Sequence, residues 1–225
     1  MQTRILSRTH LGLPLVAHDF TPPSTSSARP LPRVLILGGV HGDEIEGVAC
    51  ARGLLEAFLT HFPYQLQVTL IPEMNPEGVL LKTRGNAQGV DLNRNLPTKD
   101  WSPEAKTPRY QPGPHPLSEK ENQALVEELK KTPQLILSLH SWKPILNVNG
   151  DCLPEAEILA KITGYGIDTD IGYPTPGALG TYAGLERQMP TLTYEIERGL
   201  SLDQVLKIHV PAILEMLKTT EKRHA

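Results

Sequence analysis

The sequence predicts an α/β fold: a single-domain, three-layer α/β/α arrangement with a mixed, mostly parallel central sheet. Strand-like and helix-like segments alternate from residue 33 to the end of the chain, which is the pattern of a sheet covered by helices on both faces. No repeat, low-complexity tract or linker interrupts this alternation. At 225 residues the chain is long enough to bury a full core, so we expect residues 1–225 to form one domain.

Short apolar segments mark the strands. The clearest is Arg33-Val34-Leu35-Ile36-Leu37, bounded by Pro32 and a pair of glycines, because an uninterrupted apolar run is typical of a strand buried on both faces. An N-terminal edge strand is expected before it, joined to the core by a proline- and serine-rich loop over residues 21–32. Further strands are expected at residues 65–71, 134–139 and 191–196.

Helical spacing of apolar residues and capping signals mark the helices. Ser118 and Glu121 fit a capping box. Ser201-Leu202-Asp203-Gln204 should cap the last helix, and the interior Pro211 should kink or split that helix. The helices are expected at residues 44–59, 118–131 and 154–162, and from residue 201 onwards.

Two long segments lack regular patterning: residues 73–117, and residues 147–151 continuing into 164–184. Loops of this length in a compact domain are usually functional. We therefore expect both segments to contribute to a binding or catalytic site.

Composition excludes several classes of protein. The hydrophobic fraction is 39% and the charged fraction 21%, as in ordinary globular proteins, and the formal net charge of −3 gives no reason to expect nucleic acid or an anionic membrane as a partner. No apolar run approaches the roughly 20 residues of a membrane span. No secretory signal is visible, and Cys50 and Cys152 are too few for a disulfide framework. These features lead us to expect a cytoplasmic location.

Three residues of the kind that bind zinc fall at one edge of the predicted sheet. His41 and Glu44 follow the strand at residues 33–37, in a tight turn where open α/β sheets place their chemistry. An imidazole and a carboxylate suit zinc, which in catalytic sites takes a third protein ligand and keeps one position for water. His140 ends a neighbouring apolar strand at the same edge, and it completes a candidate ligand set.

Glu195 is a fourth candidate, because it lies within a strand that is otherwise fit for burial. A charged side chain there is costly unless it is paired or faces a cavity. One interpretation places it at the exposed end of the strand. The other places it beside the metal, where it accepts a proton from the attacking water and passes it to a leaving amine.

The order of these motifs resembles that of the zinc carboxypeptidases of the carboxypeptidase A type. The resemblance covers roughly residues 33–218 and is specific, because several motifs occur in a fixed order. Residues 83–97 and 172–177 are similar to a bacterial branch of that family, the murein peptide amidases. The shared motifs are His41-x-x-Glu44, Asn75-Pro76-Glu77-Gly78, Asp91-Leu92-Asn93-Arg94-Asn95, a strand ending in His140, and Tyr194-Glu195.

The resemblance implies a catalytic set. His41, Glu44 and His140 match the ligands of one zinc ion per chain, and Glu195 matches the general base. Arg84 matches the arginine that helps zinc to polarise the scissile carbonyl and to hold its oxyanion, a role that suits a fixed guanidinium in a dry site.

The resemblance also implies residues that bind substrate. Asn93 and Arg94 match the pair that grips the terminal carboxylate, and Tyr173 matches a mobile tyrosine that closes over the bound substrate. Asp91 and Asn95, by contrast, are expected to shape the turn through local backbone hydrogen bonds.

The function implied by the resemblance is a zinc-dependent amidase. It would cut the amide bond between the γ-carboxyl of D-glutamate and meso-diaminopimelate in small murein peptides, as part of peptidoglycan recycling. Three alternatives remain: a carboxypeptidase that releases the C-terminal residue of other peptides, an N-acyl amino acid deacylase of the aspartoacylase or succinylglutamate desuccinylase kind, and an inactive zinc- or peptide-binding module. The deacylases share His-Gly-x-Glu and Asp-Leu-Asn-Arg but usually add a β-rich domain. An inactive module would be expected to lose Glu195 or Arg84, and both are present.

Two features depart from the digestive members of the family. Those proteins carry an arginine between the first two ligands where this chain has Asp43, so an outer subsite of the substrate-binding site should differ. The proline-rich residues 101–116, with Arg109 and Tyr110, have no clear counterpart. This segment is expected to form either one wall of the cleft or a surface loop.

Overall fold

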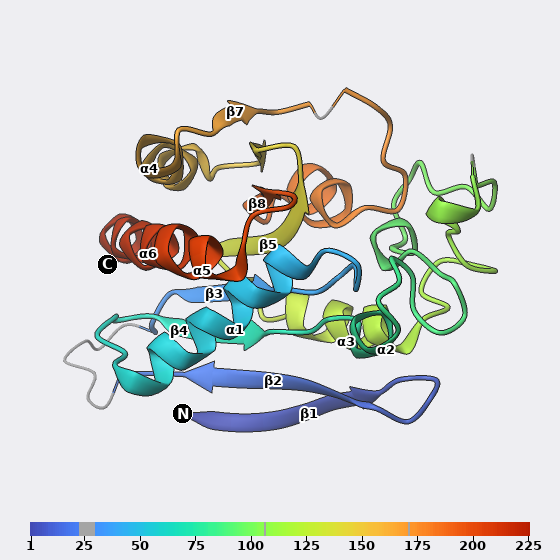
Figure 1. Cartoon of the computed structure of the whole chain (residues 1–225), viewed down its shortest axis with the longest axis horizontal. Coiled ribbons are helices and arrows are strands. Elements are labelled where there is room, and N and C mark those ends of the chain that lie inside the picture. The colour runs from blue at the N-terminus through green and yellow to red at the C-terminus, as the bar shows by residue number, and fades with distance from the viewer. Residues whose placement is uncertain (23–29, 106, 171) are drawn as a thin grey trace.

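The computed structural model describes residues 1–22, 30–105, 107–170 and 172–225, and within them eight strands form one sheet (Figure 1). The strand order is β1-β2-β4-β3-β5-β8-β6-β7, and the four central strands β4, β3, β5 and β8 are parallel. Strands β1, β2 and β6 join the sheet through antiparallel pairings. The predicted mixed, mostly parallel sheet is therefore confirmed. The strands are β1 Gln2–Arg8, β2 Pro14–Phe20, β3 Arg33–Leu37, β4 Gln67–Ile71, β5 Leu135–Trp142, β6 Ile145–Asn149, β7 Gly166–Asp168 and β8 Thr191–Glu197.

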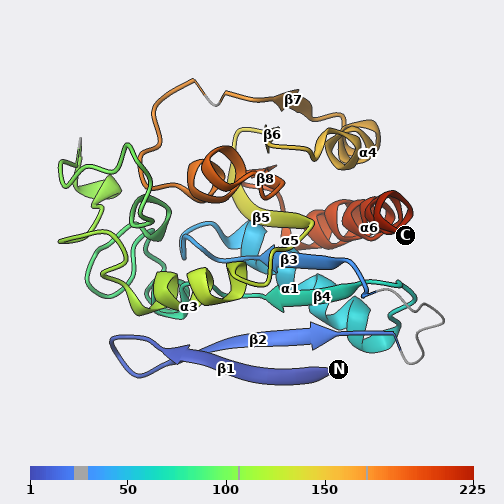
Figure 2. The ribbon, with the colours of Figure 1, turned by 180° about the vertical axis from the view of Figure 1, so that it is seen from behind.

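Helices cover both faces of the sheet, as predicted for three layers. Figure 1 shows α1, α4 and α6 on the near face, and Figure 2 shows α3 and the helical turn at residues 180–185 on the other. In the part of the chain that the structure describes, no helix is both long and apolar enough to cross a lipid bilayer. The α-helices are α1 Ile45–Thr60, α2 Pro76–Leu81, α3 Lys120–Leu129, α4 Leu153–Thr163, α5 Leu202–Gln204 and α6 Val210–His224.

Each face of the sheet has its own hydrophobic core. Val34 and Ile36 of β3 belong to the core beneath α1, α4 and α6, whereas Leu35 and Leu37 belong to the core beneath α3. Because successive side chains of a strand point to opposite faces, a strand covered on both sides must be apolar at every position. This explains the uninterrupted run that the sequence shows at β3.

The capping predictions had different outcomes. The capping box at Ser201 and Gln204 is confirmed, and the helix after it is divided: a π-helical stretch, Val205–His209, leads into α6, which has Pro211 in its first turn. The prediction of a capping box at Ser118 was wrong, because α3 begins at Lys120 without a side-chain cap. The Ser118 hydroxyl instead donates to Glu119 Oε1 at 2.6 Å.

Ser118 also accepts a hydrogen bond from Asn95 Nδ2 at 2.8 Å. The side chain of Asn95 donates to the carbonyl of Pro112 at 2.8 Å as well, and its oxygen lies 3.3 Å from the side-chain nitrogen of Asn122. The prediction that Asn95 shapes its own turn was therefore wrong. Asn95 ties the long segment before α3 to that helix, which fixes the position of this segment.

Several elements were not predicted. The N-terminal edge is a hairpin of two strands, β1 and β2, where one strand was expected, and the loop predicted after it lies partly outside the described residues, at 23–29. Strands β6 and β7 and the π-helical turn Gly180–Leu185 fall largely in the segments without clear patterning. These elements are short, and in β6 the polar residues Asn147 and Asn149 interrupt the apolar pattern.

Candidate metal centre and active-site cleft

The three predicted metal ligands meet at the carboxyl ends of two adjacent parallel strands. His41 and Glu44 lie in the turn between β3 and α1, and His140 lies in β5, which pairs with β3 in parallel. The turn needs glycine, because a Cβ atom on Gly42 would lie 1.8 Å from the carbonyl carbon of Gly78. Asn75 supports this contact: its side chain caps α2 by accepting from Gly78 N at 2.8 Å.

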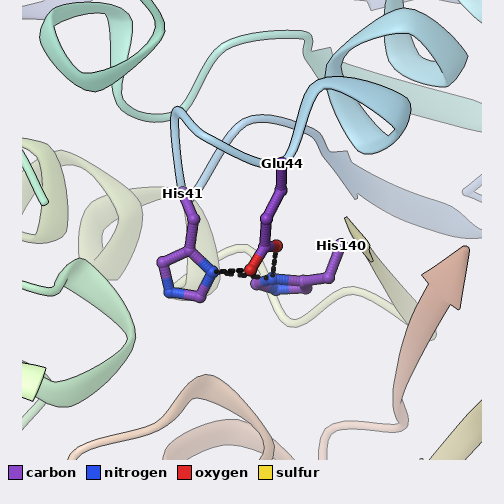
Figure 3. Close-up of side chains that lie close together, drawn as sticks. All are labelled: His41, Glu44 and His140. Carbon is purple, nitrogen blue, oxygen red and sulfur yellow. Dashed lines mark hydrogen bonds and ion pairs between the residues drawn. The ribbon is translucent and has the colours of Figure 1, made fainter. Parts of the chain in front are cut away.

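The side chains of the three residues converge on one point (Figure 3). His41 Nδ1 lies 2.9 Å from Glu44 Oε1, His140 Nδ1 lies 2.9 Å from Glu44 Oε2, and the two Nδ1 atoms are 3.2 Å apart. All three residues are buried, and one ligand atom from each lies within 4.8 Å of the others. Two imidazoles and a carboxylate at this spacing can bind one metal ion, and the donor set suits zinc.

The far nitrogen of each imidazole has its own partner. His41 Nε2 lies 2.9 Å from Asp91 Oδ1, and His140 Nε2 lies 3.0 Å from the hydroxyl of Ser138. Such outer contacts fix the orientation of a histidine ring and leave Nδ1 available to the metal. The two rings are therefore held in place by the protein itself.

Asp91 does more than shape its own turn, which is the role predicted from the sequence. Its carboxylate does accept from the backbone N–H of Asn93 at 2.9 Å, but it also holds His41 and accepts from Arg84 Nε at 2.9 Å. Sequence reasoning missed this bridge. The available signal was that a buried metal-binding histidine needs an acceptor for its other nitrogen.

Charges around the metal centre compensate one another. Burial alone would raise the pKa of Glu44, but His41 and His140 outweigh it and hold that pKa well below its usual range. Burial alone would lower the pKa of His41, but Glu44 and Asp91 outweigh it and raise that pKa. A metal ion at this point would take the place of the protons on the imidazoles.

Arg84 lies beside the metal centre. Its guanidinium donates to Asp91 and, from Nη1, to Glu44 Oε1 at 3.2 Å, and it lies 5.2 Å from the centre of the Tyr110 ring. The side chain is mostly buried and lines the cleft. Arg84 is thus a fixed positive charge next to the predicted metal ligands.

Glu195 faces the same centre from β8. It is the register partner of His140 across the β5–β8 pair, and it lines the cleft. Its Oε2 is buried and has no hydrogen-bond partner among the described residues. Burial, helped by the nearby charge of Glu44, raises the pKa of Glu195 to about 7 despite the opposing effect of His140. Of the two interpretations of this residue, the cleft-facing one agrees with the structure.

Asn93, Arg94 and Tyr173 also line the cleft. Arg94 is only 6% exposed, its guanidinium lies 5.3 Å from the centre of the Tyr110 ring, and it forms no ion pair with any residue that the structure describes. Asn93 Oδ1 accepts from Leu179 N at 2.8 Å. Tyr173 is 40% exposed and packs edge-on against Trp142, with ring centres 5.9 Å apart.

The cleft has a volume of about 540 Å³ and is bordered by both segments without regular patterning. Arg109 and Tyr110 line it, so the proline-rich segment forms a wall of the cleft, although residue 106 lies outside the described part. Sequence reasoning missed the polar side chains that β6 contributes. Asn147 and Asn149 are 7% and 6% exposed and line the cleft.

Comparison with known proteins agrees with this geometry. Residues 1–196 match the family described as zinc carboxypeptidase. Murein peptide amidase A of Vibrio campbellii is 32% identical over 92% of this chain and 84% of its own length, and murein peptide amidase A of Escherichia coli K12 is 30% identical over 96% and 89%.

Solved structures show the same fold. The crystal structure of a murein-tripeptide amidase from Escherichia coli O157 has a TM-score of 0.76 and 28% identity, and the match covers 96% of this chain and 91% of that one. Thrombin-activatable fibrinolysis inhibitor has a TM-score of 0.81 at 16% identity, covering 98% and 69%, and is evidence for the fold alone. The chain therefore belongs to the zinc carboxypeptidase family of hydrolytic enzymes.

Proposed function

We propose that this chain is a zinc-dependent amidase that cleaves the γ-D-glutamyl–meso-diaminopimelate bond of murein peptides, with residues 1–225 acting as one catalytic domain. The observation that carries the proposal is the buried cluster of His41, Glu44 and His140 with the unpartnered Glu195 carboxylate facing it. The substrate class comes from the relatives named murein peptide amidase A, which match over more than nine-tenths of this chain.

His41, Glu44 and His140 would hold the zinc ion. Bound zinc supplies a Lewis acid that polarises the scissile carbonyl and lowers the pKa of water. Glu195 would accept the proton of the attacking water and deliver it to the nitrogen of the leaving amine. A carboxyl group whose pKa is raised to about 7 is suited to both halves of this transfer near neutral pH.

Arg84 would stabilise the negative charge that develops on the carbonyl oxygen. Its guanidinium is already oriented by Asp91 and Glu44. A donor that is fixed before the reaction does not need to reorganise during it, and this is the main way in which enzymes stabilise an oxyanion.

Arg94 would bind the terminal carboxylate of diaminopimelate, with Asn93 beside it and Tyr173 closing over the substrate. A buried guanidinium without an anionic partner is costly, and Arg94 has none among the described residues. A carboxylate from the substrate would supply that partner in a charge-assisted, bidentate contact.

We place the reaction in the recycling of cell-wall peptides in the cytoplasm. Cys50 and Cys152 are both buried with free thiols, which agrees with a reducing compartment. We do not favour a general carboxypeptidase or an N-acyl amino acid deacylase, because the curated relatives that match over 92% and 96% of the chain are both named for murein peptides.

The test is to incubate the zinc-loaded protein with L-Ala-γ-D-Glu-meso-diaminopimelate and to identify the products by mass spectrometry. The proposal predicts L-Ala-D-Glu and free diaminopimelate. A matched peptide in which D-glutamate is linked through its α-carboxyl should be cut much more slowly. Release of C-terminal residues from α-linked peptides with the murein tripeptide left intact would contradict the proposal.

A further inference from the structure

Asp43, which stands between two of the predicted metal ligands, is held by two arginines from distant parts of the chain. Arg109 Nη2 donates to Asp43 Oδ2 at 3.2 Å. Arg198 Nη2 donates to the backbone carbonyl of Asp43 at 2.7 Å and lies 3.3 Å from Oδ2. Arg109 belongs to the helical turn Pro108–Tyr110, and Arg198 directly follows β8, the strand that carries Glu195.

Both arginines belong to the cleft as well as to this contact. Arg109 and Arg198 line the cleft that holds the candidate metal centre, and their side chains are 45% and 40% exposed. Each contacts Asp43 through one terminal nitrogen only. Since a guanidinium has five N–H donors, most of them remain free to bind a ligand.

The charges at this point do not cancel. Two guanidiniums face one carboxylate, so the cluster of Asp43, Arg109 and Arg198 carries an excess of one positive charge. It is distinct from Arg94, whose guanidinium is held by the carbonyl of Asn93 and the ring of Tyr110. The cleft therefore has a second set of guanidiniums, besides that of Arg94, that suits an anion.

A substrate of the proposed class also carries anionic groups on both sides of the bond to be cut. A glutamyl residue linked through its γ-carboxyl keeps its α-carboxylate free, separated from the scissile carbonyl carbon by three carbon atoms. The terminal carboxylate of the leaving residue lies on the other side of that bond. An α-linked peptide has no carboxylate so close on the acyl side unless its side chain provides one.

We propose that Arg198, together with Arg109, forms a second carboxylate-binding subsite. It binds the free α-carboxylate of the γ-linked D-glutamyl residue. This inference rests on the proposed function. Asp43 is a positioning residue in it, because it holds the two guanidiniums at the cleft without contacting the substrate. The subsite would distinguish acyl residues that carry a carboxylate at this distance from those that carry none, whereas Arg94 would recognise a terminal carboxylate in either.

The experiment compares two tripeptides that differ at one group. One is L-Ala-γ-D-Glu-meso-diaminopimelate, and the other carries a carboxamide in place of the glutamyl α-carboxylate, as in D-isoglutamine. The two are almost equal in size, but only the first has the charge. The wild-type enzyme should cleave the acid with a kcat/KM roughly 10- to 100-fold higher, the range expected for one charge-assisted contact.

Arg198→Gln should abolish most of this preference. Its kcat/KM for the acid should fall toward its own kcat/KM for the carboxamide, so that the ratio of the two approaches one. Arg109→Gln should act in the same direction with a smaller effect, and Arg198→Lys should retain part of the preference. Arg52→Gln is the matched control, because Arg52 is an exposed arginine paired with Glu73 outside the cleft.

The outcomes separate this inference from the proposed function. Equal cleavage of both tripeptides by the wild-type enzyme would overturn the subsite and leave the amidase activity standing. This comparison needs no variant, so it holds even if Arg198→Gln does not fold. Equal loss on both substrates in Arg198→Gln would show that Arg198 only secures the turn that carries Asp43. Cleavage of neither tripeptide by the zinc-loaded wild type would overturn the proposed function and the subsite with it.

Discussion

Two groups of charged residues at the cleft differ in whether the protein balances their charges. On the side of β3 and β5, His41, Glu44 and His140 are buried and bonded to one another. Asp91 and Arg84 extend this cluster, so positive and negative groups balance within the protein. A second pair of residues, which we call the unbalanced side, differs: Arg94 is buried without an ion pair among the described residues, and Glu195 has a buried oxygen without a partner.

This difference separates two tasks. Charges that the protein balances internally hold the metal ligands in place, and their geometry is set before any substrate arrives. Charges that the protein leaves unbalanced are costly in the free enzyme, and a ligand that carries the missing partner relieves that cost. We therefore expect changes on the balanced side to affect metal binding, and changes on the unbalanced side to affect substrate binding and turnover.

The largest expected effect is that of His140→Ala on metal binding. The change removes one of three ligands, and zinc affinity should fall by more than the ~10- to 100-fold that is typical of losing an outer-contact residue. Zinc per chain, measured by elemental analysis after dialysis, should drop toward zero. His115→Ala, in an exposed part of the proline-rich segment, is the control and should keep its zinc. One zinc per chain in His140→Ala would remove this residue from the ligand set.

The next largest effect is expected for Glu195→Gln. This variant tests whether the Glu195 carboxylate, on the unbalanced side, takes part in the catalytic step. The glutamine keeps the shape but cannot accept the proton, so kcat should fall by roughly 10²–10⁴-fold while zinc content stays unchanged. Glu197→Gln, two residues further along the same strand and exposed, should retain near-wild-type kcat. A turnover of Glu195→Gln close to wild type would assign the base to another residue.

Arg94→Gln should lower kcat/KM by about 10- to 100-fold on a substrate with a free terminal carboxylate, because one charge-assisted contact is lost. On the same peptide amidated at that end, the variant and the wild type should differ little. The unfolding midpoint of the free variant should not decrease, since the substitution removes an unpaired buried charge. A lower midpoint together with equal losses in kcat/KM on both substrates would mean that Arg94 stabilises the folded protein and does not bind the substrate carboxylate.

The sequence was sufficient for the parts of the molecule that depend on local patterns. The run at β3 predicted a strand buried on both faces, and the positions of His41, Glu44 and His140 at strand ends predicted that the three would meet. Strand ends converge because parallel neighbours share one edge of the sheet. No further information about long-range contacts was needed there.

The parts that the sequence did not predict depend on contacts between distant segments. Asp91 binds a histidine 50 positions away, and Ser118 leaves its expected cap because Asn95 and Glu119 provide other partners. Neither competing partner is visible in a local pattern. The same holds for the pairing of Asp43 with Arg198, which are 155 positions apart.

The smallest expected effect is that of Tyr173→Phe. The ring of Tyr173 packs edge-on against Trp142, and the residue is 40% exposed at the cleft, so it is held by packing and its hydroxyl is available to substrate. Removing the hydroxyl alone should lower kcat/KM by about 2- to 10-fold, the value of one neutral hydrogen bond. Tyr173→Ala also removes the ring that would close over the substrate, and it should cost more. If Tyr173→Phe lost as much activity as Glu195→Gln, the hydroxyl would belong to the proton transfer itself. If Tyr173→Ala matched the wild type, Tyr173 would lie at the cleft without binding substrate, and the unbalanced side would depend on Arg94 and Glu195 without it.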